Sequence, residues 1–137
     1  MEDCIFCKIA SNQIPCYKIW EDSKYLSFLD INPVTEGMTL VIPKKHTDSD
    51  IFKNDQKVIN EIMEASKKVS LLLMKSLNIE RVGVVFEGLE VEHLHVKLIP
   101  ISGGKFIKSI LNSNYPKPTT EELDILAEKI RSKGKLN

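Results

Sequence analysis

The stretch Val91-Glu92-His93-Leu94-His95-Val96-Lys97-Leu98-Ile99-Pro100 organises the predicted fold. Its polar and apolar residues alternate with a period of two, and its Val, Leu and Ile residues favour a strand with one face against a core. Side chains at i and i+2 of a strand share a face, roughly 6.5 to 7 Å apart. The pattern therefore predicts one row of His93, His95 and Lys97. An edge strand with a solvated polar face would give the same alternation, so the pattern alone does not assign chemistry.

The remaining elements are predicted from hydrophobic periodicity. Short strands are expected over 17–21 and 25–29 as a hairpin, over 38–43, and over 81–86, with Glu87-Gly88 as a tight turn into the histidine strand. Apolar residues at three- and four-residue intervals predict an amphipathic helix over 54–77. A last helix is expected over 121–131, where Thr119 and Glu122 fit a capping box. This order predicts an α+β fold with a five-stranded antiparallel sheet, one long helix and a C-terminal helix.

The length of 137 residues fits one domain, with a core over 1–100 and a C-terminal extension over 101–137. Lys plus Arg and Asp plus Glu both number 19, so no global basic field is available for a nucleic-acid backbone. No basic segment followed by an apolar region marks the N-terminus, and no apolar run approaches the roughly 20 residues that span a bilayer. We therefore expect a cytoplasmic protein that does not bind membranes.

Cysteine and histidine residues suggest a metal site. Cys4 and Cys7 have the spacing at which two thiolates bind one ion, and adding His46 and His93 gives a Cys2His2 set. Such a set is typical of structural zinc, because four protein ligands leave no open position for a reactive water. The alternative is that these residues are unrelated, and spacing alone does not decide between the two readings.

Four segments carry a recognisable pattern: Cys4-Ile-Phe-Cys-Lys-Ile, Tyr25-Leu-Ser-Phe-Leu-Asp-Ile-Asn-Pro33, Leu40-Val-Ile-Pro-Lys-Lys-His46 and His93-Leu-His-Val-Lys-Leu-Ile-Pro100. Together they resemble the histidine triad (HIT) family of nucleotide hydrolases and transferases. The resemblance covers nearly the whole chain up to Pro100. It implies a HIT-like fold, a structural Zn²⁺ on Cys4, Cys7, His46 and His93, and a homodimer.

The resemblance also implies roles for individual residues. His95, at the middle motif position, would attack the α-phosphate of a purine nucleotide or dinucleoside polyphosphate, form a covalent nucleotidyl-histidine and release it to water. A carbonyl, expected from the backbone, would hold the opposite ring N–H of His95. The base would lie among apolar walls and the ribose hydroxyls on a carboxylate; the implied nucleotide-binding residues are Phe6, Ile9, Phe28, Asp30 and Ile31.

The sequence departs from the family pattern in two places. Lys97 occupies the third motif position, where the family has histidine. Lysine keeps a cation but is a poorer proton shuttle, with an ordinary pKa near 10.4, so we expect Lys97 to stabilise charge and to favour acidic leaving groups over amines. The short segment 87–92 is acidic instead of Gly-rich. The resemblance makes a hydrolase the leading hypothesis. A nucleotidyltransferase is one alternative, and Lys97 with the acidic segment supports the other, a catalytically weak nucleotide-binding protein.

Overall fold

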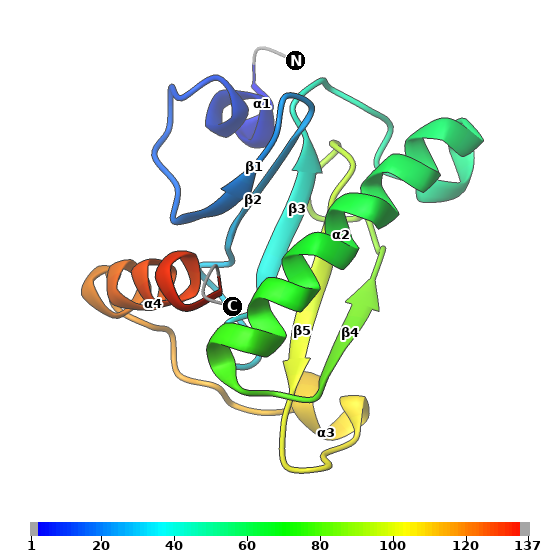
Figure 1. The fold of residues 1–137 in the computed structure, drawn as a ribbon. Coiled ribbons are helices and arrows are strands. Elements are labelled where there is room, and N and C mark those ends of the chain that lie inside the picture. The colour runs from blue at the N-terminus through cyan, green and yellow to red at the C-terminus, as the bar shows by residue number, and fades with distance from the viewer. Residues whose placement is uncertain (1–2, 135–137) are drawn as a thin grey trace.

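The computed structural model describes residues 3–134. Its elements in chain order are α1 (Ile5–Ala10), β1 (Lys18–Glu21), β2 (Tyr25–Leu29), β3 (Thr39–Pro43), the 3-10 helix η1 (Ile51–Lys53), α2 (Gln56–Leu77), β4 (Arg81–Val85), β5 (Val96–Ile101), α3 (Ile107–Leu111) and α4 (Thr120–Gly134) (Figure 1). The predicted α+β class is confirmed. The helices α1 and α3 were not predicted.

The five strands form one antiparallel sheet in the order β1-β2-β3-β5-β4. The predicted hairpin is present as β1 and β2. Because β5 pairs with both β3 and β4, the segment that enters β5 lies beside the end of β3. The backbone N–H of Leu94 donates to the carbonyl of Thr47 at 2.9 Å. This topology brings His46, which follows β3, next to the histidines that precede β5.

One face of the sheet packs against α2 and α4. Alternate strand residues, among them Tyr25, Val41 and Leu98, contribute to this core. The helix α2 buries the stripe Ile62, Ala65, Ser66, Val69, Leu73 and Ser76, and α4 adds Leu123, Ala127 and Ile130. Figure 1 shows α2 running diagonally across the sheet, with α4 beside β1.

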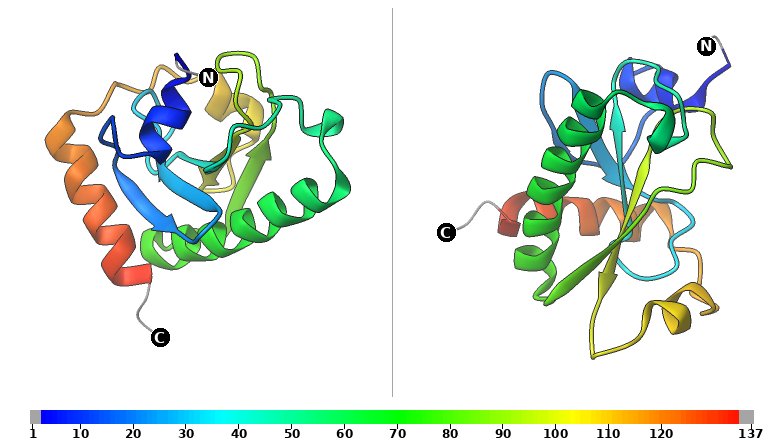
Figure 2. Two further views of the ribbon diagram at one scale, coloured as in Figure 1. Left: turned by 90° about the horizontal axis from the view of Figure 1, so that it is seen from above. Right: turned by 90° about the vertical axis from the view of Figure 1, so that its right-hand side faces the viewer.

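The opposite face of the sheet is covered by two short helices (Figure 2). Near one end, α1 packs Phe6 and Ile9 against Phe28, Leu40 and neighbouring apolar residues. Near the other end, Ile110 of α3 packs against Met38 and Ile99, which form a separate small cluster. Because Phe28 and Leu40 pair in register and Leu40 pairs with Lys97, the side of the sheet that faces α1 carries Lys97.

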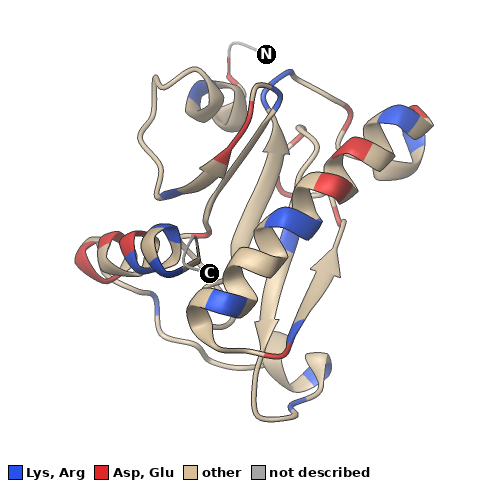
Figure 3. Cartoon of the chain, viewed as in Figure 1, with Lys and Arg blue, Asp and Glu red and all other residues tan. Residues whose placement is uncertain are grey.

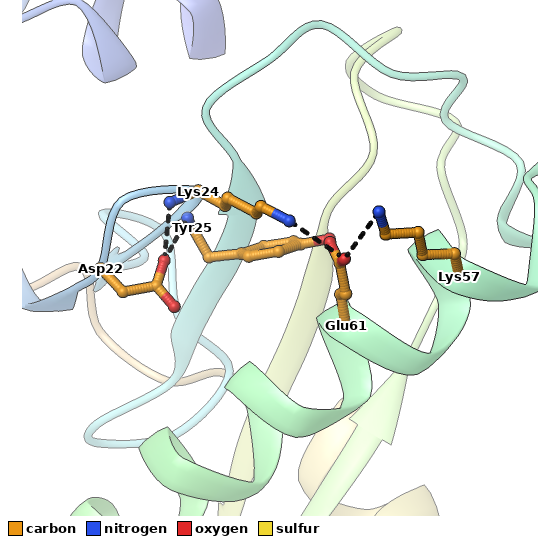
Figure 4. A network of polar contacts seen from close by, with 5 residues as sticks. All are labelled: Asp22, Lys24, Tyr25, Lys57 and Glu61. Carbon is orange, nitrogen blue, oxygen red and sulfur yellow. Dashed lines mark hydrogen bonds and ion pairs between the residues drawn. The ribbon is translucent and has the colours of Figure 1, made fainter.

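Polar contacts fix the ends of the two long helices. Near the start of α2, Glu61 lies 3.2 Å from the Lys24 ammonium, 3.9 Å from that of Lys57 and 3.4 Å from the Tyr25 hydroxyl (Figure 4). The predicted capping box of α4 is confirmed: the backbone N–H of Glu122 donates to the Thr119 hydroxyl, and that of Thr119 donates to the Glu122 carboxylate, each at 3.1 Å.

Charge is interspersed over the helices. Acidic residues lie in the first turn of α4, and Arg131 and Lys133 lie in its last turn, an arrangement that complements the helix dipole (Figure 3). Within residues 3–134, no helix combines the length and apolar character needed to cross a bilayer.

The histidine strand is shorter than predicted. Residues 91–95 are irregular, and β5 begins only at Val96. The His93 N–H donates to the Val91 carbonyl at 2.9 Å, a local turn contact that replaces a ladder bond. His93 and His95 are buried, so the alternative of a solvated polar face is wrong; both rings pack against Phe6, on the side of the sheet that carries Lys97. The expected tight turn at Glu87-Gly88 is likewise wrong, because an irregular connection spans 86–95.

Candidate functional site

The four predicted metal ligands lie together. Their ligand atoms all lie within 4.8 Å of one another. The Cys4 Sγ lies 3.4 Å from the His93 Nδ1, and the Cys7 Sγ lies 3.4 Å from that same nitrogen and 3.3 Å from the His46 Nδ1. Tetrahedral zinc with bonds of about 2.3 Å to sulfur and 2.05 Å to nitrogen requires sulfur–nitrogen separations of about 3.5 Å. The three measured sulfur–nitrogen separations are close to this value, so the four residues could hold one metal ion.

Hydrogen bonding and burial prepare His93 to bind a metal. Its Nε2 lies 2.8 Å from the Pro43 carbonyl, which can only accept, so Nε2 carries the proton and Nδ1 offers a lone pair to the cysteines. Burial is the largest effect on His93 and lowers its pKa, which favours the neutral imidazole that metals bind. Burial and then the neighbouring Cys4 raise the pKa of the Cys7 thiol. A bound cation would offset this by stabilising thiolates.

His95 is held in one tautomer. Its Nδ1 lies 2.8 Å from the His93 carbonyl and donates its proton there. This carbonyl, two residues earlier in the chain, is the backbone partner that was expected. Among residues 3–134, the Nε2 of His95 has no hydrogen-bond partner, although the imidazole lines a cavity. The Phe6 ring packs against the His95 ring at 74° with centroids 5.2 Å apart. The arrangement presents an unprotonated ring nitrogen in a fixed orientation, which suits a nucleophile.

The cavity in front of His95 has a volume of about 250 Å³. Its lining includes every predicted nucleotide-binding and catalytic residue: Phe6, Ile9, Phe28, Asp30, Ile31, His95 and Lys97. Phe6 and Phe28 pack edge to face with centroids 5.9 Å apart. One carboxylate oxygen of Asp30 accepts the Asn32 N–H at 2.8 Å, which orients the carboxylate. Flat apolar walls with one acid suit a nucleoside, although the individual roles stay predictions.

Glu90 also lines this cavity, and the sequence analysis did not assign it to the site. Its carboxylate lies 3.6 Å from the Lys97 ammonium, and the Lys97 side chain is 17% exposed against 72% for Glu90. The acidic segment 87–92 therefore supplies a counter-ion to Lys97. The lysine partly offsets the repulsion that a nearby carboxylate would exert on a phosphate. Other lining residues not predicted are apolar or small, and include Ile14, Cys16, Tyr17 and Val91.

A second cavity, of about 290 Å³, lies between the β2–β3 connection and α4. It shares Leu29 and Asp30 with the first cavity, but no histidine or cysteine lines it. The first cavity is lined by His95 and Lys97, and the Phe6 ring in its wall also packs against the metal-ligand candidate His93, so the chemistry is assigned there.

Comparisons with known proteins agree with the geometry. A family model described as "HIT domain" matches residues 11–103. An uncharacterized HIT-like protein of Borreliella burgdorferi is 42% identical over 106 residues, which cover 73% of this chain and 76% of the relative. An adenosine 5'-monophosphoramidase of Schizosaccharomyces pombe is 32% identical over 132 residues, covering 96% of this chain and 98% of that enzyme. A crystal structure of a hypothetical histidine triad nucleotide-binding protein from Sulfolobus tokodaii superposes with a TM-score of 0.81 at 30% identity, covering 96% and 91% of the two chains.

Proposed function

Because the chain belongs to the HIT domain family, we propose that it is a nucleotide hydrolase that cleaves a nucleoside or dinucleoside polyphosphate at the α-phosphate, with His95 as nucleophile. The observation that carries this proposal is the His95 ring, whose Nδ1–H is bound to a backbone carbonyl while its ring lines an apolar cavity. The name of the Schizosaccharomyces pombe relative supports an adenine nucleotide as the substrate.

The reaction proceeds in two steps. The lone pair of the His95 Nε2 forms a bond to the α-phosphorus, and the bond from phosphorus to the bridging oxygen breaks, so the remaining phosphate leaves as an oxyanion. A water oxygen then displaces the imidazole from phosphorus and loses its proton to solvent, which releases the nucleoside monophosphate. The Lys97 ammonium lines the same cavity and stabilises the negative charge on the phosphate oxygens in both steps.

We propose that the metal is Zn²⁺, bound by Cys4, Cys7, His46 and His93. Two thiolates and two neutral imidazoles are ligands that zinc takes readily, and the donor separations support a closed tetrahedral site. When bound, the ion supplies folding free energy and no reactive water. Free thiols at Cys4 and Cys7 also support a reducing, cytoplasmic location. Purification without chelators followed by elemental analysis should find one zinc per chain; absence of metal would remove this assignment.

We also propose a homodimer. The strand β4 is at the edge of the sheet, and its Val84 side chain is 45% exposed. On α2, Met63 and Leu71 are exposed apolar residues outside the buried stripe. An open strand edge with exposed apolar residues favours pairing with a second copy. Sedimentation velocity should give twice the monomer mass, and Val84→Lys should shift the species to monomer; a monomeric wild-type protein would contradict the proposal.

The activity is tested by a substrate panel followed by phosphorus NMR. It includes diadenosine polyphosphates, ATP and adenosine 5'-monophosphoramidate, with His95→Ala as the control. The proposal predicts turnover of the anhydrides in preference to the phosphoramidate, because Lys97 does not readily protonate an amine leaving group. Adding alcohol or sugar-phosphate acceptors separates hydrolysis from nucleotidyl transfer. If no substrate is consumed while AMP still binds, the protein is a nucleotide-binding protein.

A further inference from the structure

Phe6 connects the metal ligands to the nucleophile. It lies between Cys4 and Cys7 in the chain, on α1. Its ring packs edge to face against His95 at 5.2 Å, against His93 at 5.8 Å and against Phe28 at 5.9 Å between centroids. The Phe6 side chain therefore contacts the proposed nucleophile, a metal-ligand candidate and the proposed base site together.

The helix that carries Phe6 is too short to be stable on its own and depends on its contacts with the rest of the fold. It has only six residues, and isolated helices shorter than about 12 residues are marginal in water. Its N-cap is Cys4, whose sulfur accepts the Cys7 N–H at 3.4 Å, although Ser, Thr, Asp or Asn are the residues that usually cap helices well. Within residues 3–134, α1 forms hydrogen bonds to residues 11–14, which follow it directly in the chain. The polar contacts that reach distant segments are those of Cys4 and Cys7 with His46 and His93, and Phe6 and Ile9 add apolar packing against the sheet.

A second connection reaches His95 through the backbone. The His93 ring is held between the Pro43 carbonyl and the two cysteine sulfurs, and the His93 carbonyl accepts the Nδ1 proton of His95. The metal ligands are thus connected to the His95 imidazole in two ways. The Phe6 ring packs against it, and the His93 carbonyl fixes its rotation.

We propose that Phe6 is a positioning residue for His95, and that a metal ion on Cys4, Cys7, His46 and His93 keeps Phe6 in place. Loss of the ion releases α1. The Phe6 ring then no longer forms a fixed wall for the base, and the His95 ring is free to rotate. Occupancy of a site that does no chemistry then controls nucleotide affinity and the orientation of the nucleophile. This inference rests on the proposed role of His95, and it adds a function for the metal beyond folding.

The test compares Phe6→Leu with Phe52→Leu, a matched change at a phenylalanine that is 89% exposed in η1, away from the cavity. NMR of ¹³C-labelled histidine rings reports the position of His95 without any need for turnover. In zinc-loaded Phe6→Leu we expect shifted or doubled His95 signals, a kcat lower by about tenfold to a hundredfold, and weaker AMP binding because Phe6 also lines the proposed base site. Phe52→Leu should match wild type in all of these measurements.

The metal is tested by removing it from the full wild-type chain. The stripped protein should bind AMP at least about tenfold more weakly, its His95 signals should move toward those of Phe6→Leu, and added Zn²⁺ should restore both. Near-UV circular dichroism of Trp20, the single tryptophan, reports the core on the α2 face. If removing the metal abolishes that circular dichroism signal, the metal-loaded Phe6→Leu protein becomes the deciding sample. Its cobalt form should keep the absorption spectrum of a tetrahedral site while the His95 NMR signals shift. Unchanged His95 signals in Phe6→Leu would overturn the inference, whether or not any substrate is hydrolysed.

Discussion

Replacing Gly88 with alanine tests how the irregular segment 86–95 is held. Gly88 has a φ of +72°, and a Cβ at this position would lie 2.4 Å from the Ser49 carbonyl oxygen and 3.0 Å from its carbon. Both are backbone atoms, so no side-chain rotation relieves the contact. The segment must move away from Ser49, and it carries Glu90, His93 and His95.

The matched control is Gly103→Ala. Gly103 has a similar φ of +65°, but nothing lies within 4 Å of a Cβ built there. An L-residue in the left-handed backbone conformation costs about 1–2 kcal/mol, so both variants should lose this amount of stability. Replacing glycine with alanine also reduces the chain entropy of the unfolded state, and this effect is the same in both variants. Overpacking adds about 1–3 kcal/mol at Gly88 alone. We therefore expect losses of about 2–5 kcal/mol for Gly88→Ala and about 1–2 kcal/mol for Gly103→Ala.

Urea unfolding followed by Trp20 fluorescence measures the two losses, with equal m-values required for the comparison. The rate of the first nucleotidyl transfer in a single turnover should also fall in Gly88→Ala and stay at the wild-type value in Gly103→Ala. Equal free energies of unfolding for the two variants would refute the packing of the segment against Ser49. An unchanged transfer rate in Gly88→Ala would refute the claim that this packing places His95.

Three further outcomes are expected. Ser27→Ala should raise the free energy of unfolding by about 1 kcal/mol, because the buried Ser27 hydroxyl has no hydrogen-bond partner among the described residues. Thr39→Val should lower it by about 1 kcal/mol, because the buried Thr39 hydroxyl donates to a backbone carbonyl at 2.8 Å. Urea titrations measure both changes. Burial and then Glu61 raise the pKa of Tyr25 to about 12, so the stabilising contribution of the protonated phenol is fully present below pH 10 and is lost as the pH rises from 10 to 12. Tyr25→Phe should show a shallower fall over that range. Lys97→Gln should slow anhydride cleavage by about a hundredfold in phosphorus NMR assays while zinc content stays unchanged.

The sequence predicted the five-stranded sheet because strand signals are local, and it singled out the cysteine and histidine cluster because few residue types bind metals. Alternation marked the strands, helical periodicity marked α2, and the capping box at Thr119 marked the start of α4. Cys4 and Cys7 have a spacing that a single ion requires, and the structure brings His46 and His93 to them. The division into a core over 1–100 and an extension over 101–137 stays a prediction, although α4 packs into the main core.

The segment before β5 could not be predicted, because residues 91–95 alternate like a strand while their backbone groups bond elsewhere. The Leu94 N–H donates to Thr47, and the His93 carbonyl accepts from the His95 side chain. These hydrogen bonds join residues whose pairing no local sequence pattern indicates. The ion pair between Glu90 and Lys97 was missed for the same reason, and α1 is too short to show a helical period.

The most direct test of the proposed function is mass spectrometry of the protein, quenched with denaturant at alkaline pH to preserve a phosphorus–nitrogen bond, after a brief exposure to a diadenosine polyphosphate. The account predicts one added adenylyl group, mapped to His95 in the peptide digest, that forms before free AMP appears and disappears as AMP accumulates. His95→Ala should form no adduct and hydrolyse no substrate. Hydrolysis by the wild-type protein without any adduct, together with retained turnover in His95→Ala, would contradict the account.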